Sequence, residues 1–181
     1  MTYNYVMLKN YNKWKIAKLF FSFPSRTFEI REISRLVLIA PLSVKNYLLK
    51  LTQDKIIKTS IISNRKYESY TANIDNLNYK RYKQIHNKIL IEESGLIEYL
   101  DEIIAPDSIV LFGSFFLGEN VENSDVDLFV QAKEEIIDLS KFERKLGFKI
   151  HLIFSEKIAD LPENLMKNIL NGNVVSGYLV I

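Results

Sequence analysis

Residues 108–130 read SIVLFGSFFLGENVENSDVDLFV. An apolar run at 108–112 leads into Gly113-Ser114, and ten residues separate this turn from Asp125-Val126-Asp127, which opens a second apolar run. Short apolar runs bounded by glycine and polar residues are typical of buried strands. We therefore predict strands at 108–112 and 126–131, with a short helix near 115–118 between them.

The two aspartates at the start of the second run are candidate metal ligands. Side chains alternate along a strand, so Asp125 and Asp127 share one face, roughly 6 to 7 Å apart, while Val126 and Leu128 point to the core. Two carboxylates on one face repel each other unless a cation lies between them, and hard oxygen ligands suit Mg²⁺, which also binds substrate phosphates. This pair predicts the metal half of a phosphoryl-transfer site.

The turn before the aspartates is a candidate nucleotide contact. Gly113 lets the backbone approach a ligand closely, and Ser114 offers a hydroxyl and an amide. The start of the following helix presents N–H groups that suit an anion. We predict that Gly113 and Ser114 contact the phosphates.

The pattern Gly113-Ser114, ten residues, Asp125-x-Asp127 resembles the signature of minimal nucleotidyltransferases of the DNA polymerase β superfamily, including antitoxin-like members, over residues 96–181. The resemblance implies that Gly113 and Ser114 hold an NTP and that Asp125 and Asp127 bind Mg²⁺, with two ions in an active member. It implies transfer of a nucleoside monophosphate to an acceptor hydroxyl. The acceptor and the NTP stay open, because relatives modify proteins, antibiotics or nucleic acids.

Two positions depart from the family pattern. The predicted strand 148–154 has His151 where the family carries a third carboxylate, and an imidazole can act as base or ligand but supplies no negative charge. Phe115-Phe116 stands where many relatives carry an arginine, and Lys149 is either a substitute for that charge or an exposed strand lysine. We therefore count His151 as a candidate catalytic residue beside Asp125 and Asp127. The alternative is a DNA-binding regulator, or an antitoxin-like protein, whose transferase domain is catalytically degenerate.

The charge of the chain is divided between its halves. Residues 1–90 carry 17 Lys/Arg against 5 Asp/Glu, a net of +12, and residues 91–181 carry 7 against 17, a net of −10. Such a division favours a first half that faces a polyanion and a second half whose carboxylates hold cations or solvate the surface.

The first half has the element order of a winged helix-turn-helix. Helical periodicity predicts helices at 11–22 and 28–37 and a third beginning at Pro41, followed by strands at 56–62 and 66–71 with a basic tip between them. Further helices are predicted at 75–94, 96–104, 134–146 and 165–170, with an extended segment at 174–181. The fold class is thus α+β. We expect a winged helix-turn-helix at 1–75, a connecting helix at 76–95, and at 96–181 a nucleotidyltransferase-like domain with a small mixed sheet flanked by helices.

If this arrangement is correct, the third helix enters the DNA major groove and the hairpin lies along the backbone. The predicted DNA contacts are Ser43, Lys45, Asn46 and Lys50 on the helix and Arg65 and Lys66 at the hairpin tip. Asparagine can pair with adenine, and lysine with guanine or phosphate. Winged helices also serve as protein-interaction modules, which is the alternative function.

The composition of the chain excludes some kinds of site and of cellular location. There is no cysteine, so disulfides and thiolate metal sites are excluded, and no apolar run approaches the roughly 20 residues that cross a bilayer. We expect a soluble, cytoplasmic protein with no membrane partner. The expected partners are an NTP and double-stranded DNA. The family resemblance adds a toxin-type protein, and helix-turn-helix proteins often form homodimers to match paired half-sites.

Overall fold

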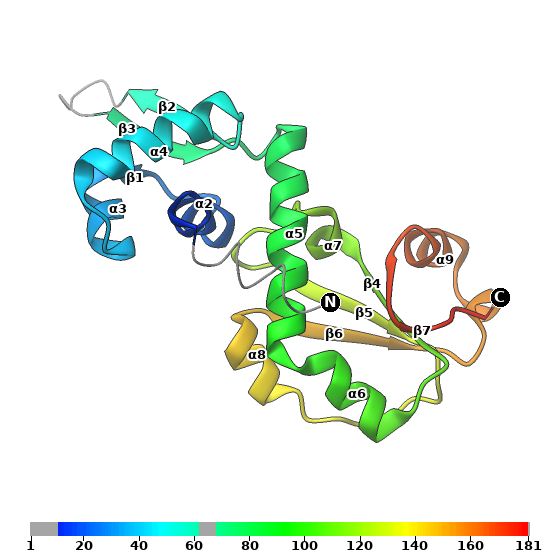
Figure 1. Ribbon diagram of the computed structural model, residues 1–181. Coiled ribbons are helices and arrows are strands. Elements are labelled where there is room, and N and C mark those ends of the chain that lie inside the picture. Colours follow the sequence, from blue (N-terminus) through cyan, green and yellow to red (C-terminus); the bar gives the residue numbers. More distant parts are fainter. Residues whose placement is uncertain (1–10, 62–67, 181) are drawn as a thin grey trace. The chain divides into compact units, whose positions relative to one another are not determined.

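The structure is a computed structural model that describes residues 11–61 and 68–180 (Figure 1). The chain divides into two compact units, Met1–His86 and Asn87–Ile181. The division falls within one helix, α5 (Leu77–Ser94). Each unit is described by itself below.

Unit 1 combines helices with a small antiparallel sheet. The strand order is β1-β3-β2. In chain order its elements are α2 (Asn12–Ser22), β1 (Phe28–Glu29), α3 (Ile30–Val37), α4 (Pro41–Gln53), β2 (Ile57–Ile61), β3 (Glu68–Ala72) and the first part of α5. Pro41 is the first residue of α4, as predicted from its fixed φ and missing amide hydrogen.

The prediction of a helix over the whole of 28–37 was wrong at its start. Phe28 and Glu29 form β1, and Phe28 pairs with Tyr70 of β3. The Phe28 side chain is fully buried. This strand depends on a partner more than forty residues away, so local helical periodicity could not reveal it. The predicted hairpin tip, with Arg65 and Lys66, lies outside the described residues.

Unit 2 is built on a four-stranded mixed sheet of order β6-β5-β4-β7. The β5–β6 pair is parallel, and β4 is antiparallel to both β5 and β7. The elements are α6 (Leu96–Ile104), β4 (Ser108–Phe112), α7 (Gly113–Leu117), β5 (Asp125–Val130), α8 (Ser140–Leu146), β6 (Lys149–Phe154), the 3-10 helix η1 (Ile158–Asp160), α9 (Glu163–Leu170) and β7 (Asn173–Gly177). The predicted small mixed sheet flanked by helices is therefore confirmed.

The prediction of a helix at 134–146 was wrong in its first half, because α8 begins only at Ser140. Glu134, Glu135 and Ile136 are exposed, so a helix there would have no apolar face to bury, and short helices depend on such packing. The Asp138 carboxylate accepts a hydrogen bond of 2.9 Å from the Ser140 amide just before the first turn of α8. The 3-10 helix η1 was not predicted.

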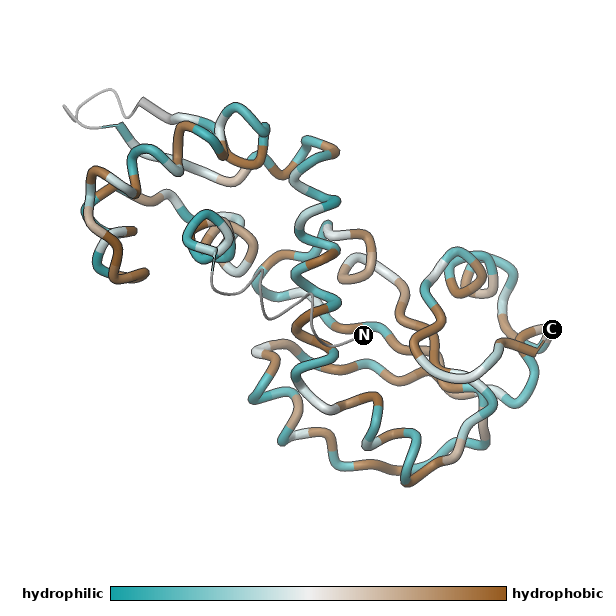
Figure 2. The backbone as a smooth tube through the Cα atoms, in the orientation of Figure 1, coloured by the Kyte–Doolittle hydropathy of each residue, from teal (hydrophilic) through white to brown (hydrophobic). Residues whose placement is uncertain are grey.

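The two faces of the sheet in unit 2 are covered by different helices (Figure 1). Val126 and Leu128 of β5 pack into a larger apolar cluster with residues of α6 and α8. Phe129 points the other way, into a smaller cluster with Ile158 of η1 and Ile169 of α9. The strands β4, β5 and β6 are apolar over most of their length (Figure 2). Because side chains alternate along β5, Asp125 and Asp127 lie on the same face of the sheet as Phe129, the face that α9 covers.

Among the helices of the described segments, none combines the length and the apolar character that crossing a bilayer requires.

Unit 1 buries an ionisable group that the predicted functions do not use. His86 of α5 is 2% exposed and packs against the rings of Trp14 and Phe21. Its Nε2 atom has no hydrogen-bond partner among the described residues. Burial, together with the positive charges of Lys18 and Lys83, lowers the pKa of His86 to about 3. The histidine is therefore neutral in the folded protein at neutral pH.

We expect His86 to destabilise the protein as the pH falls from about 6.5 toward 3, because the unfolded chain binds a proton there and the folded chain does not. The loss approaches about 1.4 kcal/mol for each pH unit within this window. Denaturant unfolding of the unaltered protein and of His86→Phe at pH 7 and pH 5.5 measures it. The unaltered protein should lose about 1 kcal/mol more than the variant between these values. An equal loss in both proteins would show that His86 does not bind a proton on unfolding.

Candidate functional site

Two carboxylates begin β5. Asp125 is exposed and Asp127 is half-buried, and between them Val126 is fully buried on the opposite face. The structure thus brings Asp125 and Asp127 to one face of the sheet. Both carboxylates lie where the strand begins, beyond the apolar cluster formed by Phe129 with η1 and α9.

The Gly113 turn lies directly against Asp127. Phe112, the last residue of β4, pairs with Asp127 across the antiparallel ladder. Gly113 follows with φ +72°, and a Cβ atom at this position would lie 2.3 Å from Asp127 Oδ2. Both the left-handed backbone and the close approach require glycine here. The turn and the carboxylate therefore share one small space.

Buried polar contacts hold α7 in place after the turn. The Ser114 carbonyl accepts hydrogen bonds from the amides of Glu119 at 2.9 Å and Asn120 at 3.2 Å. The Asn87 side chain of α5 donates to the Phe115 carbonyl at 2.6 Å and to Asn120 Oδ1 at 2.9 Å. Asn87 and Asn120 are both buried. These bonds fix the backbone of Ser114 beside Asp127, while the Ser114 hydroxyl makes no hydrogen bond within the described segments.

His151 lies next to Asp127. The two residues are opposite each other in the parallel β5–β6 pair. His151 Nδ1 is 3.2 Å from Asp127 Oδ1, a distance at which an Nδ1–H group donates to the carboxylate. The His151 side chain is 58% exposed and that of Asp127 25% exposed, so more than half of the histidine side chain is open to solvent.

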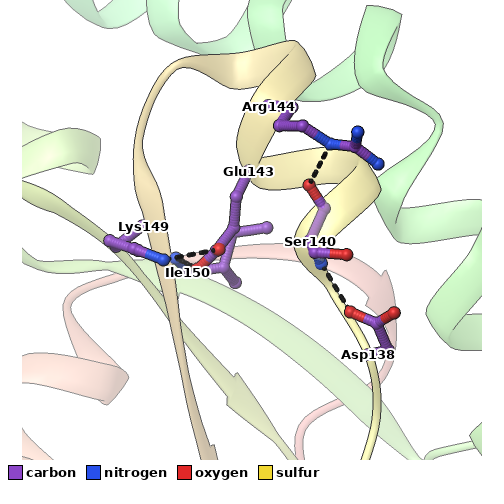
Figure 3. A network of polar contacts seen from close by, with 6 residues as sticks. All are labelled: Asp138, Ser140, Glu143, Arg144, Lys149 and Ile150. Carbon is purple, nitrogen blue, oxygen red and sulfur yellow. Dashed lines mark hydrogen bonds and ion pairs between the residues drawn. The ribbon is translucent and has the colours of Figure 1, made fainter.

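Lys149 is paired with a carboxylate of α8, as Figure 3 shows. Its Nζ donates to Glu143 Oε2 at 2.9 Å, and the Ile150 amide donates to Glu143 Oε1 at 3.1 Å. Hydrogen bonds from Lys149 and then from the Ile150 amide lower the pKa of Glu143, and the Glu143 carboxylate raises the pKa of Lys149, with a smaller contribution from Asp125. Lys149 is therefore partly engaged by Glu143 and is not a free counter-charge for a phosphate.

Three residues of this region were missed by sequence reasoning. Glu143 binds the outer edge of β6, the terminal strand of the sheet, and Asn87 and Asn120 hold α7. Glu143 lies on a helix whose apolar stripe gives no hint of its partner. Asn87 and Asn120 are 33 positions apart, and no local pattern links them.

The carboxylates of Asp125 and Asp127 are suited to a metal ion that a substrate also coordinates. They are too few for a metal site made of protein ligands alone. Among the described residues, no group of three or more His, Cys, Asp or Glu side chains has the arrangement to hold a metal ion. Mg²⁺ in phosphoryl-transfer sites is usually bound by one or two carboxylates together with substrate phosphates. Asp125 and Asp127 meet that requirement only with phosphates alongside them.

The comparison with protein families bears on this site. Residues 94–176 match the family model "Polymerase beta, Nucleotidyltransferase". The match supports the polymerase β superfamily for unit 2 and covers the turn, both aspartates and His151. Comparisons with curated proteins and with solved structures gave no match. The match thus supports a nucleotidyltransferase-like unit 2, and His151 lies at the position where we expected the third carboxylate.

The predicted DNA contacts of unit 1 lie on one side of α4. Lys45, Asn46 and Lys50 are exposed and Ser43 is half-buried. The opposite stripe, made of Val44, Leu48 and Leu51, is fully buried. The exposed side of α4 therefore presents two lysines and an asparagine to solvent.

Replacing Gly113 should separate the cost of backbone strain from the cost of displacing Asp127. Gly147 is a matched control because it also has a positive φ, +77°, but a Cβ there would meet nothing within 4 Å. We expect Gly147→Ala to cost about 1 kcal/mol of unfolding free energy, and Gly113→Ala about 2 to 3 kcal/mol because the Asp127 carboxylate must also move off His151. Denaturant unfolding measures both, and equal costs would contradict the close packing of Gly113 on Asp127.

Proposed function

We propose that unit 2 binds a nucleoside triphosphate together with Mg²⁺ and transfers its nucleoside monophosphate to an acceptor hydroxyl. The observation that carries the proposal is the packing of the Gly113 turn against Asp127, with Asp125 on the same face of β5. A phosphoryl-transfer enzyme needs carboxylates for a cation and backbone that comes close to phosphates, and these elements supply both. The family match over residues 94–176 supports the same class of reaction.

Each residue of the site has a role in this proposal. Asp125 and Asp127 would hold Mg²⁺ jointly with the nucleotide, and the bound ion would polarise the phosphoryl oxygens and neutralise developing charge. Gly113 and Ser114 would lie along the phosphates. His151 would receive the proton of the acceptor hydroxyl through the ring nitrogen that does not face Asp127.

A second candidate function is favoured by His151 itself. The imidazole stands where a carboxylate is expected and is hydrogen-bonded to Asp127. A site that has lost a metal-binding carboxylate can still bind nucleotide. In this alternative the chain is a DNA-binding regulator, or an antitoxin-like protein with a toxin-type partner, whose transferase domain senses nucleotide or a partner without turnover.

Nucleotide binding and transfer should be measured separately. We expect the unaltered protein to bind one or more of ATP, CTP, GTP and UTP with Mg²⁺, and Asp127→Asn to weaken that binding at least about tenfold through loss of a charge-assisted contact. Isothermal titration calorimetry measures the affinity, and Asp160→Asn, an exposed aspartate of η1, is the control that should bind as the unaltered protein does.

Transfer of a labelled monophosphate that is lost in Asp125→Asn would establish the enzyme. Binding without transfer would favour the regulator. Failure to bind any of the four nucleotides would contradict both nucleotide roles, the transfer and the sensing of nucleotide, and would leave a regulator that binds a partner.

We further propose that unit 1 is a winged helix-turn-helix that binds double-stranded DNA, with α4 in the major groove. The order of α2, α3 and α4 followed by the β2–β3 hairpin supports it. So does the net charge of +12 on residues 1–90. The exposed side of α4 would make the contacts, and a homodimer would place two such helices on paired half-sites.

Salt dependence tests this assignment. Each lysine that contacts a phosphate should contribute about one unit to the slope of log K against log salt concentration. We expect Lys45→Ala and Lys50→Ala each to lower the slope by about one unit, as fluorescence anisotropy with duplex DNA would measure. Lys141→Ala, an exposed lysine of α8, should leave the slope unchanged. Equal slopes for all three variants would exclude α4 as the DNA-contacting helix.

A further inference from the structure

The strands β5 and β6 place acidic side chains opposite nitrogen-bearing side chains. In the parallel β5–β6 pair, Asp125 is opposite Lys149 and Asp127 is opposite His151. Residues opposite each other in a ladder point to the same face. Each carboxylate of β5 therefore has a nitrogen-bearing neighbour on β6. One of these neighbours, His151, lies where we expected the third carboxylate.

These neighbours reduce the negative charge that the site offers to cations. The His151 imidazole carries no negative charge in either protonation state, and its Nδ1 lies 3.2 Å from Asp127 Oδ1. Lys149, which lies opposite Asp125 in the ladder, is a cation paired with Glu143, so it supplies no negative charge to the site either. Two divalent ions in a phosphoryl-transfer site lie about 3.5 to 4 Å apart, so their mutual repulsion must be offset by the carboxylates around them.

The nearby acid of α8 cannot take the place of a third metal ligand. Glu143 Oε2 accepts from Lys149 Nζ, and Oε1 accepts from the Ile150 amide, so both oxygens are already bonded to β6. Within the described residues, no set of three or more potential metal-binding side chains converges on one point. In the part of the chain that the structure describes, the acidic candidates for metal binding at this site are therefore Asp125 and Asp127.

We propose that this site binds its nucleotide with one divalent cation and not two, because His151 stands beside Asp127, where a second ion would need a carboxylate ligand. The proposal rests on the nucleotide binding proposed above. The single ion is held by Asp125, Asp127 and the phosphates of the nucleotide. Residue 151 sets the number of ions, and a carboxylate at that position restores the second.

Counting bound ions tests the proposal without measuring turnover. Mn²⁺ is the probe, and electron paramagnetic resonance of free Mn²⁺ gives the number bound per chain. A non-hydrolysable nucleoside triphosphate analogue of the base that binds best is added at one equivalent per chain, so that no excess nucleotide chelates the ion. We expect one ion for the unaltered protein, two for His151→Asp, and one for His151→Asn, the neutral control. The side chain of His151 is 58% exposed, so these substitutions are compatible with folding, and His151→Glu provides a second carboxylate variant.

The outcomes separate this inference from the proposed function. Two Mn²⁺ ions on the unaltered protein with nucleotide bound would overturn the inference and leave the proposed function intact. One ion in every variant, including both carboxylate variants, would overturn the assignment of residue 151 as the deciding position. Failure of the analogues and of all four NTPs to bind would overturn the proposed function and this inference together.

Discussion

The antiparallel register between β4 and β5 is the constraint on which the site depends. It sets Phe112 opposite Asp127, so the chain leaving β4 must turn directly over that carboxylate. Only glycine fits at residue 113, because the backbone is left-handed and a Cβ atom would overlap the Asp127 side chain. The rest of the site follows from this contact. Ser114 is fixed beside it by the amides of Glu119 and Asn120, and Asp125 shares its face by alternation along β5.

The parallel pairing of β6 with β5 then determines which charged and polar groups lie beside Asp125 and Asp127. It sets a lysine and a histidine against the two aspartates, and Glu143 of α8 holds the outer edge of β6 by binding one amide and one ammonium. The resulting site is less negative than one lined by three carboxylates. In the function proposed above, the phosphates of the nucleotide would complete the coordination of a cation that the two carboxylates hold only in part.

Unit 1 has a different physical basis. Its core is aromatic, with Trp14, Phe21 and Tyr79 packed in succession and the Tyr79 hydroxyl bonded to the Phe20 carbonyl at 3.0 Å. The same core encloses His86 and keeps it neutral. The basic side chains of α4, Lys45 and Lys50, are outside, whereas Lys83 of α5 is buried. A chain with a basic first half and an acidic second half thus carries most of its positive charge on one unit and the two aspartates of the candidate site on the other.

The sequence by itself determined the elements that depend on local pattern. The apolar runs at 108–112 and 126–131, the helix at Pro41 and the alternation of Asp125 with Val126 all follow from side-chain period and backbone preference. Local pattern failed where a residue is specified by a distant partner. Phe28 is a strand residue because Tyr70 lies beside it, and residues 134–136 are exposed and lack the packing that would stabilise a helix.

The interior of the site was decided by tertiary structure alone. Strand order brings β6 beside β5, and only that neighbour relation sets His151 on Asp127 and Lys149 near Asp125. The ion pair of Lys149 with Glu143 and the Asn87–Asn120 contact join residues from separate elements. The sequence shows which charged groups are present. Their electrostatic interaction energies depend on the distances between the charges, and these distances are fixed only when the sheet and its helices pack together.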